Sequence, residues 1–321
     1  MGKKLSLVFI ICVSLAGYAW ADRQADYTAA VLADNPLGYW QFEDAASYDG
    51  APCADSAAGG LSPGVYRNRL QGTPNDVPDI TLVTGFLGCG QAAKFHGTIS
   101  GGKGNFVEIF DNVDSGARLM TPSCTIEFWM RALPTENETY ARFISHAEGT
   151  TNNYWIGMAT AGSSPGQPFV GVPGATWYAG PPILTNGQWH HVVVTYTYND
   201  PNTTTELWID CISRGTHEDA GAFTGPTNDW ADLIIGAENN QYWVFNGFVG
   251  LLDEVAYYDY ALSENQISIH FPLIYPPYPG DINWDRRVDF KDFAELCLHW
   301  QTIGGFDTLA DIADSWLIEY Y

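Results

Sequence analysis

The sequence predicts an all-β sandwich of the jelly-roll type, followed by a small helical module. Its 321 residues include 33 Gly and 18 Pro, so turn signals recur along most of the chain. Between the turns lie short segments rich in β-branched and aromatic residues, such as 124–130 and 189–198. Many short strands of this kind imply a sandwich. Beyond a proline-rich segment at 274–280, the pattern becomes that of amphipathic helices.

The first 21 residues predict a secretory signal peptide. Lys3 and Lys4 give a positive start, and the apolar run at 5–15 is too short to span a bilayer. Ala19 and Ala21 are small residues where a signal peptidase reads, so we expect cleavage after Ala21 and a secreted or cell-surface protein. An N-terminal anchor helix is the alternative. No later stretch is apolar enough to cross a membrane, so no insertion is expected after cleavage.

The mature chain is expected to be strongly acidic. The sequence carries 14 basic and 37 acidic side chains; loss of Lys3 and Lys4 leaves 12 basic ones and a net charge of −25. Such a surface repels nucleic acid and anionic lipid, so neither is an expected partner. Acidity confers solubility, and it also suits binding of Ca²⁺.

Five cysteines remain after Cys12 leaves with the signal peptide, and none of them pairs at zinc-ligand spacing. An exported chain can form disulfides. Cys53 and Cys89 both lie in loops rich in Gly and Pro, which favours a bridge between them. Because five is odd, at least one thiol stays free or pairs between chains, and Cys297 is the expected free one.

The domain boundaries follow from these patterns. After the signal peptide, residues 22–274 are interpreted as one sandwich domain, 275–280 as a stiff linker and 281–321 as a helix pair.

Two helical turns and several structural residues are expected within the sandwich. The turns lie at 26–32 and 263–267, where Ser263 can cap the helix. His190 and His191 point to opposite faces of a strand, so they cannot jointly chelate one ion and are interpreted as structural. Three tryptophans in apolar strands are assigned to the core: Trp40, Trp129 and Trp189.

A series of motifs then suggests a family. They are YWQFE at 39–43, DS at 55–56 with GG at 59–60, AKFHG at 93–97, FVEI at 106–109, CTIEFWM at 124–130, GQWHH at 187–191, LWID at 207–210, and FVGLLDEV at 248–255 with YALS at 260–263. In this order they resemble the laminin G-like, or concanavalin A-like, jelly rolls. Two positions depart from the pattern: His96 stands where Asp is usual, and Cys211 replaces a hairpin Gly.

A calcium site is predicted at the closing strand. On a regular strand Asp253 shares one face with Leu251 and Val255, and Glu254 points to the other. Because one face of a sandwich strand is buried, we expect at least one carboxylate to be partly buried. An unpaired charge is costly there, and Ca²⁺ would compensate it. A buried Asp bound by backbone N–H groups is the alternative.

The resemblance implies partners for Asp253 in this site. Related jelly rolls hold a structural Ca²⁺ between the closing strand and the N-terminal segment. By resemblance the partners here would be Glu43, Asp44 or Asp55, with backbone carbonyls near His96 and Gly97.

Catalysis is not predicted. Laminarinase-type hydrolases of this fold carry Glu-x-Asp-x-x-Glu on one strand, and the sequence contains neither this motif nor Gly-x-Ser-x-Gly or His-Glu-x-x-His. A hydrolase or lyase accessory protein with an unrecognised catalytic arrangement is the less favoured alternative.

Binding is the favoured function. Flat aromatic faces suit the apolar C–H faces of sugar rings, which predicts a polysaccharide or other glycan as the ligand. The alternatives are that about half of these rings belong to the core, or that the surface is structural or adhesive and binds other proteins. The predicted ligand-binding residues lie in segments rich in Gly, Asn and Pro: Trp155, Trp177, Tyr178, Trp230, Tyr242 and Trp243.

Residues 281–292 resemble a dockerin-type, EF-hand-like calcium loop. Arg286 replaces the Gly of the sharp turn, which predicts weakened affinity. Helix repeats follow at 290–300 and 306–316 without a second loop, so at most one Ca²⁺ is expected in the tail. An acidic helix start without metal is the alternative. The resemblance implies a cohesin-like or other surface protein as partner. The expected side-chain ligands are Asp281, Asn283, Asp285, Asp289 and Asp292.

Overall fold

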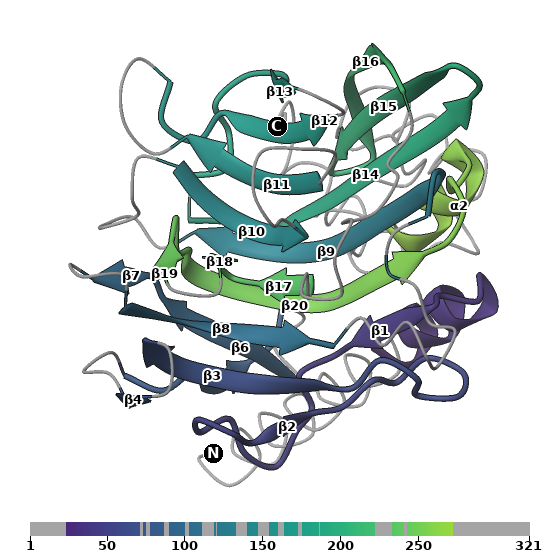
Figure 1. The fold of residues 1–321 in the computed structure, drawn as a ribbon. Helices are drawn as coiled ribbons and strands as arrows, with labels where there is room; N and C mark the ends of the chain where they lie inside the picture. Colours follow the sequence, from purple (N-terminus) through teal and green to yellow (C-terminus); the bar gives the residue numbers. More distant parts are fainter. Residues whose placement is uncertain are drawn as a thin grey trace, which may run out of the picture. The chain divides into compact units, whose positions relative to one another are not determined.

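Two large antiparallel sheets make up most of the regular structure in the first of the chain's two units, Met1–Ile267, in this computed structural model (Figure 1). The second unit is Ser268–Tyr321. The residues that the structure describes are 24–70, 73–74, 78–86, 90–99, 103–110, 119, 121–132, 140–146, 154–159, 164–172, 175–185, 187–221, 233–240 and 243–271.

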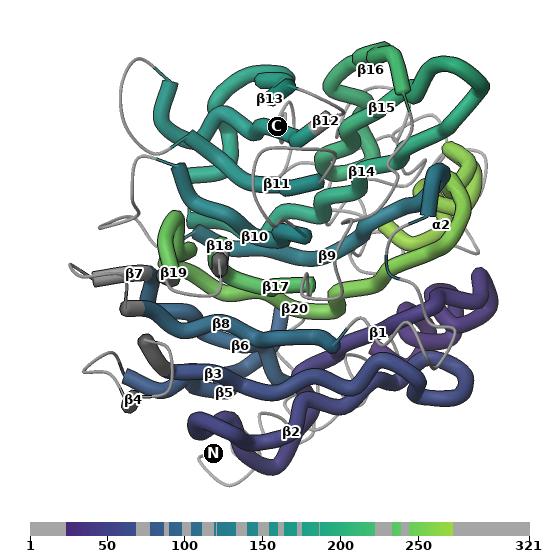
Figure 2. Tube along the Cα trace, in the orientation of Figure 1, coloured from purple at the N-terminus to yellow at the C-terminus, as the bar shows by residue number. Residues whose placement is uncertain are grey.

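The first sheet, sheet A, has eight strands in the order β16-β15-β14-β9-β20-β6-β5, with β1 paired to β20. Their bounds are β1 Gly38–Trp40, β5 Thr81–Thr84, β6 Gln91–His96, β9 Cys124–Ala132, β14 His190–Asn199, β15 Asn202–Ile209, β16 Ile212–Ala220 and β20 Val249–Tyr258. Figure 2 shows β1, early in the chain, beside the late strand β20. The sheet therefore brings the N-terminal segment against the closing strand.

The second sheet, sheet B, has ten strands in the order β13-β12-β11-β10-β17-β8-β3-β2, with β4 paired to β3 and β7 to β8. A separate hairpin is formed by β18 Glu238–Asn240 and β19 Trp243–Phe245. The bounds in sheet B are β2 Pro52–Cys53, β3 Gly64–Leu70, β4 Thr73–Pro74, β7 Thr98–Ile99, β8 Lys103–Ile109, β10 Tyr140–His146, β11 Tyr154–Ala159, β12 Pro168–Val172, β13 Ala175–Tyr178 and β17 Leu233–Ile235.

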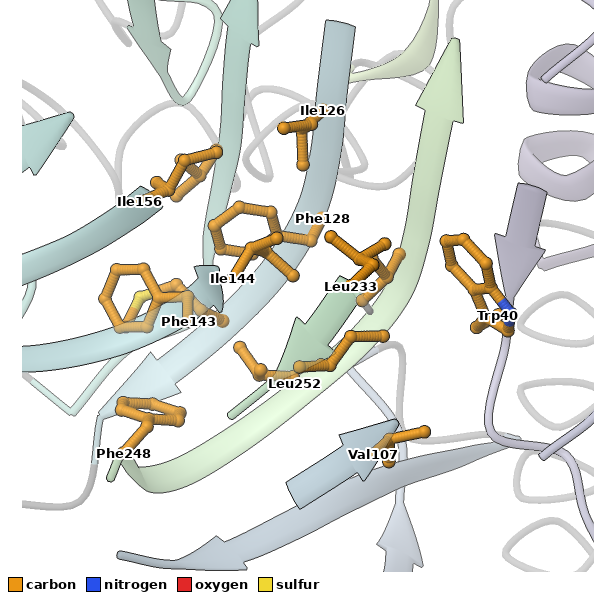
Figure 3. Packing of buried hydrophobic residues seen from close by; sticks show 14 of the residues in the cluster. Trp40, Val107, Ile126, Phe128, Phe143, Ile144, Ile156, Leu233, Phe248 and Leu252 are labelled. Atoms are coloured by element: carbon orange, nitrogen blue, oxygen red, sulfur yellow. The ribbon is translucent and has the colours of Figure 1, made fainter. Parts of the chain in front are cut away.

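Side chains from both sheets form one apolar core between them (Figure 3). Phe128 of β9 and Phe143 of β10 meet there with ring centroids 5.6 Å apart, and Trp40 of β1 is fully buried. Burial of such rings is the main favourable term in folding, because it removes apolar surface from water. This core fixes which face of each strand points outward, and so positions the candidate sites.

The outer face of sheet A is also covered, which explains the long buried run in β9. Residues 24–33 form a helix. From it, the Tyr27 hydroxyl donates to Glu127 Oε1 at 3.2 Å, and the Tyr27 ring packs edge-on against Trp129. Both faces of β9 are therefore shielded from water, and all its residues except Arg131 are buried, without the alternation of a half-exposed strand.

The expected helices are present among the described residues. The first spans 24–33, and α2 spans Glu264–His270. Ser263 caps α2 as predicted: its backbone N–H donates to Gln266 Oε1 at 3.0 Å, and the Gln266 backbone N–H donates to Ser263 Oγ at 3.4 Å. This reciprocal pair is a capping box. None of the described helices is long and apolar enough to cross a membrane.

The expected structural roles of the Trp and His residues are largely confirmed. Trp40 and Trp129 are buried in full, whereas Trp189 is half-buried against the ring of Phe86. The two histidines have different partners, as opposite faces require. His190 Nδ1 lies 2.7 Å from Asp210 Oδ2, and His191 Nε2 lies 2.7 Å from Glu127 Oε1.

The cysteines are described only in part. Cys53 and Cys124 are buried, and Cys211 is half-buried. Cys89, the expected partner of Cys53, lies outside the described residues, as does Cys297. The Cys53–Cys89 bridge stays a prediction.

Candidate functional site

A row of four outward-facing residues crosses sheet B where β10, β11, β12 and β13 lie side by side. Arg142 pairs with Gly157, Gly157 with Phe169, and Phe169 with Tyr178. Their neighbours Ala141, Ile156 and Val170 point into the core, so the row itself faces outward. Tyr140 lies two residues before Arg142 on the same face, and Trp155 two residues before Gly157. We call Tyr140, Arg142, Trp155, Phe169 and Tyr178 the aromatic face.

Glycines let the rings of this face lie flat on the sheet. A Cβ atom on Gly157 would lie 2.6 Å from Phe169 Cζ, and one on Gly171 would lie 2.6 Å from Trp155 Cδ2. Real Cβ atoms do not approach so closely, so each ring occupies the space above a glycine. With Gly157 between them in the row, the Arg142 side chain reaches Phe169 directly. Its guanidinium carbon lies 4.6 Å from the ring centroid of Phe169 and 5.3 Å from that of Trp155.

A carboxylate from the β18–β19 hairpin neutralises this cation. Arg142 Nε lies 3.2 Å from Glu238 Oε2, with the two side chains 14% and 20% exposed. The same oxygen accepts a hydrogen bond of 2.8 Å from Asn246 Nδ2, which fixes the carboxylate. Burial lowers the pKa of Arg142, and the nearby Glu238 carboxylate opposes that change. The pair thus forms a rigid polar centre among aromatic rings.

The accessible part of the aromatic face is a pair of tyrosines. Tyr140 is 42% exposed and Tyr178 is 46% exposed, and both pack against the buried ring of Phe169. Desolvation raises the pKa of the Tyr178 hydroxyl first, and a hydrogen bond with Tyr140 raises it further. Two joined rings, each with apolar surface and a hydroxyl group, offer both stacking area and hydrogen bonds.

The structure brings together only some of the predicted ligand-binding residues. Trp155 and Tyr178 share the aromatic face, whereas Trp177 points to the opposite side of β13. There it packs against the core, and its ring stacks on His217 with centroids 5.7 Å apart. Trp243 lies in β19, in the hairpin that carries Glu238. Trp230 and Tyr242 lie outside the described residues.

Sequence reasoning missed Tyr140, Arg142, Phe169 and Glu238. A signal was present for two of them: Tyr140 and Arg142 alternate with the apolar Ala141 and Phe143, as outward positions of a half-buried strand do. No local signal marked Phe169 or Glu238. Phe169 is brought to the site by the pairing of β12 with β11. Glu238 is brought there by the β18–β19 hairpin, which places it beside Arg142.

A second cluster lies on sheet A, at the closing strand. Asp253 and Glu254 are both buried, at 1% and 0% exposure, and the Glu43 carboxylate is close enough to raise the pKa of each. We call these three residues the carboxylate cluster. Glu43 Oε1 accepts hydrogen bonds from Gln24 Nε2 at 3.0 Å and from the Gln91 backbone N–H at 2.7 Å.

One oxygen of this cluster differs from the others in its hydrogen bonding. Tyr39 and Gln41 donate to Glu254 Oε2, but Glu254 Oε1 is buried without a hydrogen-bond partner among the described residues. Asp253 has partners on both oxygens: Oδ2 accepts from the Phe86 backbone N–H at 3.2 Å, and Oδ1 accepts from that of Glu254 at 2.9 Å. A buried acceptor without a donor is costly, so the cluster is incomplete as it stands.

Burial is also the first cause of the altered acidity in the cluster. Desolvation raises the pKa of Glu254 to about 7, against the lowering effect of hydrogen bonds from Tyr39, Gln41 and Gln24. It raises the pKa of Asp253 as well, and repulsion from Glu254 adds to this change. Two neighbouring buried carboxylates favour either the uptake of a proton or the binding of a cation.

The expected alternation of side chains is wrong at these residues. The pairing of β20 with β9 shifts register between Asp253 and Ala256, and Glu254 adopts a positive φ of 50°. As a result Leu252 and Val255, three residues apart, both point into the core. Asp253 therefore does not share a face with Val255. The bulge places two consecutive carboxylates at one site, which a regular strand cannot do.

Other predicted calcium ligands make different contacts. Asp44 accepts from the Ala54 N–H and the Tyr66 hydroxyl, and Asp55 accepts from the backbone N–H groups of Tyr39, Ala57 and Ser62.

The segment at 96–97 lies far from Asp253 along the pairing of β6 with β20. His96 pairs with Val249, four residues before Asp253, so the prediction of backbone ligands near His96 and Gly97 is wrong. The backbone that contacts Asp253 belongs to Phe86 instead.

Among the described residues, no group of three or more His, Cys, Asp or Glu side chains is arranged to hold a metal ion as they stand. The carboxylate cluster would thus need a change of side-chain positions to chelate one. The predicted loop ligands at 281–292 lie outside the described part of the chain.

Comparison with known proteins supports this fold. Residues 103–268, just over half of the chain, match the family described as the concanavalin A-like lectin/glucanases superfamily. Among curated protein sequences, none matches this chain.

Several solved structures share the fold at low sequence identity. Domain 4 of AbnA, a GH43 extracellular arabinanase from Geobacillus stearothermophilus solved with arabinotriose, is 18% identical with a TM-score of 0.52, over 75% of this chain and 98% of that domain. A structure of botulinum neurotoxin type C, whose cell entry depends on two ganglioside molecules, is 12% identical with a TM-score of 0.52, over 77% of this chain and 53% of that one. The binding domain of botulinum neurotoxin DC, in complex with rat synaptotagmin II, has the same four values.

Proposed function

Because the chain belongs to the concanavalin A-like lectin/glucanases superfamily, we propose that it is a secreted, non-catalytic protein that binds a polysaccharide or other glycan through its aromatic face. The observation that carries this proposal is the exposed pair Tyr140 and Tyr178 beside the Arg142 guanidinium. Sugar rings present apolar C–H faces and a rim of hydroxyl groups. Aromatic rings next to fixed donors and acceptors match both features.

The absence of catalysis is part of the proposal. Glycoside hydrolysis ordinarily uses two carboxyl groups that flank the scissile bond. Within the described residues, the carboxylate that contacts the aromatic face is Glu238, and it is held by Arg142 and Asn246. Such a carboxylate is fixed in a structural pair. The arabinanase domain with the same fold was solved with arabinotriose bound, which is compatible with a binding role.

We further propose that Ca²⁺ occupies the carboxylate cluster. Ca²⁺ takes oxygen ligands, and Glu43, Asp253 and Glu254 would supply them at the junction of the N-terminal segment and β20. The support is Glu254 Oε1, which is buried and has no hydrogen-bond partner within the described part of the chain. The ion would compensate the buried charges and join two segments far apart in the sequence. Its role would be structural, since the cluster and the aromatic face lie on different sheets.

The tail is proposed to bind a second Ca²⁺ at 281–292 and to tether the sandwich to a cohesin-like or other surface protein. This proposal rests on the ligand spacing of the loop alone.

Protein binding is the second candidate for the sandwich. One structure with the same fold, the binding domain of botulinum neurotoxin DC, was solved in complex with rat synaptotagmin II. Exposed Tyr rings and a central Arg are also typical of protein interfaces. The sandwich would then be the adhesive part of a surface protein.

A glycan array probed with the secreted protein, with Ca²⁺ and with EDTA, tests the proposal. Binding of at least one glycan class in Ca²⁺ is expected, together with no release of reducing sugar from that glycan. Absence of binding across the array would favour the protein-binding candidate. Turnover that is lost on substitution of a single carboxylate would show that the protein is an enzyme.

A further inference from the structure

The aromatic face contains one charged residue, Arg142. Arg142 is the only Asp, Glu, Lys or Arg in β10, β11, β12 and β13. It lies over the rings of Phe169 and Trp155, where a ligand that stacks on the face would meet it. An unpaired Arg there would be a ready anchor for the carboxylate or sulfate groups of acidic polysaccharides, because a guanidinium binds such groups in a fork.

Glu238 opposes such an anchor. Its Oε2 lies 3.2 Å from Arg142 Nε, so the positive charge is already paired and one edge of the guanidinium is taken. Asn246 Nδ2 holds the same oxygen at 2.8 Å, so the carboxylate cannot easily swing away. The pair is only 14% and 20% exposed, which weakens screening by water. An acidic sugar beside Arg142 would therefore meet the like charge of Glu238 at short range.

The rest of the chain adds to this effect at longer range. The net charge is −23, and a second Arg on the outer face of sheet B is neutralised in the same way: Arg67 Nε lies 2.6 Å from Glu108 Oε2. A negative protein slows the approach of a polyanion and lowers its local concentration. What remains favourable at the face is stacking on apolar C–H surfaces and hydrogen bonding to hydroxyl groups. Both are properties of neutral sugars.

We propose that the aromatic face takes neutral polysaccharides and excludes uronic-acid and sulfated ones, and that Glu238 is the residue that sets this selectivity by neutralising Arg142. The inference rests on the proposed glycan-binding function of the same face. It makes Glu238 a specificity-determining residue, although the carboxylate itself is turned toward Arg142.

The experiment compares wild type with Glu238→Gln in the full mature chain. Gln keeps the shape and the acceptor oxygen for Arg142 and Asn246, but it carries no charge. Affinity electrophoresis and calorimetry would use neutral polymers (arabinan, laminarin, glucomannan) and anionic ones (polygalacturonate, alginate, carrageenan). Wild type is expected to bind at least one neutral polymer and no anionic one. Glu238→Gln is expected to gain about tenfold or more in affinity for an anionic polymer, with a gain that falls as salt rises.

Two further variants isolate the cause. Glu218→Gln changes the net charge by the same amount on an exposed strand of sheet A, and it should gain nothing. Arg142→Gln combined with Glu238→Gln should lose the gain, because the unmasked charge is gone. Melting temperatures would show that each variant folds.

The outcomes separate this inference from the function on which it rests. Wild type that binds anionic polymers as well as neutral ones overturns the selectivity and leaves glycan binding in place. Folded Glu238→Gln that behaves like Glu218→Gln overturns the role of Glu238. Wild type that binds no polymer of either kind overturns both proposals.

Discussion

His191 Nε2 lies 2.7 Å from Glu127 Oε1, and both side chains are fully buried beneath the helix at 24–33. The other carboxylate oxygen, Glu127 Oε2, accepts from the Tyr258 hydroxyl at 2.9 Å, and Tyr27 donates to Oε1 at 3.2 Å. A polar network of this kind adds specificity to the packing of the helix on sheet A. It is costly to break, because the partners that remain cannot reach water.

Substitution of His191 by Phe should therefore destabilise the protein by about 3 kcal/mol, because it leaves a buried carboxyl group without one of its partners. Phe keeps the stack on Trp129, where the ring centroids are 4.8 Å apart, so the loss reports on the polar contact. The measurement is chemical denaturation at constant pH.

His217→Phe is the matched control. His217 also stacks on a tryptophan, Trp177, and lies 2.9 Å from a carboxylate, Asp219 Oδ2, but the imidazole is 34% exposed. Exposed pairs contribute little, so the expected loss is below about 1 kcal/mol. An equal loss of stability in His191→Phe and His217→Phe would mean that burial does not determine how much the His–carboxylate contact contributes.

Tyr140→Ala and Tyr178→Ala should each weaken glycan binding by about tenfold, because each removes an exposed stacking surface without opening the core. The measurement is calorimetry with the best glycan from the array. Tyr48→Ala serves as the control, since Tyr48 is 60% exposed and lies outside the aromatic face.

Trp177→Ala tests the assignment of that ring to the core. We expect it to lower the melting temperature while glycan affinity stays the same, because Trp177 points away from the aromatic face. A folded Trp177→Ala protein with tenfold weaker binding would return Trp177 to the binding site.

Because of the carboxylate cluster, the metal-free protein should become less stable as pH rises, which is the opposite of the usual effect of a carboxyl group. The pKa of Glu254 rises from an ordinary 4.5 to about 7 on folding, so the folded state binds more protons than the unfolded state between these values. Stability should therefore fall as pH rises through this window, by about 3 kcal/mol. Asp253, with its pKa raised by burial, acts in the same direction.

Calcium should reverse this loss. Above pH 7 the Glu254 carboxylate is ionised and can bind Ca²⁺, which stabilises the folded state by about 2.7 kcal/mol at a hundredfold excess over Kd. Thermal unfolding in EDTA and in Ca²⁺ at pH 5 to 8 measures both effects. Glu254→Gln should flatten the profile in EDTA, and Glu218→Gln should not. Identical melting in Ca²⁺ and EDTA at every pH would rule out an ion at the cluster.

Calorimetric titration of the full chain should count two calcium ions. Asp253→Asn should remove one, and Asp281→Ala combined with Asp285→Ala should remove the other, because these residues are proposed as ligands of two separate ions. Arg286→Gly should tighten the proposed tail site, since the sharp turn of an EF-hand-like loop would need a positive φ, which Gly adopts without strain. A wild-type count of one that survives the tail substitutions would remove calcium from the tail.

Local sequence determined much of the fold. The β-branched and aromatic runs at 124–130 and 189–198 correspond to β9 and β14. Such residues pack well on the pleated surface of a sheet, and this preference is local to the segment. Ser263 and Gln266 made their capping box, because its hydrogen bonds span only three residues. The motifs of the sandwich likewise indicated its family, because each is short and local in the sequence.

Only the tertiary structure decided which residues form the sites. Trp155 and Trp177 look alike in sequence, yet one joins the aromatic face and the other packs against the core. Alternation along a strand places neighbouring side chains on opposite faces of the sheet. Which of the two faces is exposed depends on how the whole strands pair and pack. Glu238 reaches Arg142 across 96 positions of the chain. The bulge at Asp253 arises from the mismatch between β20 and β9, a relation between two strands that neither segment encodes alone.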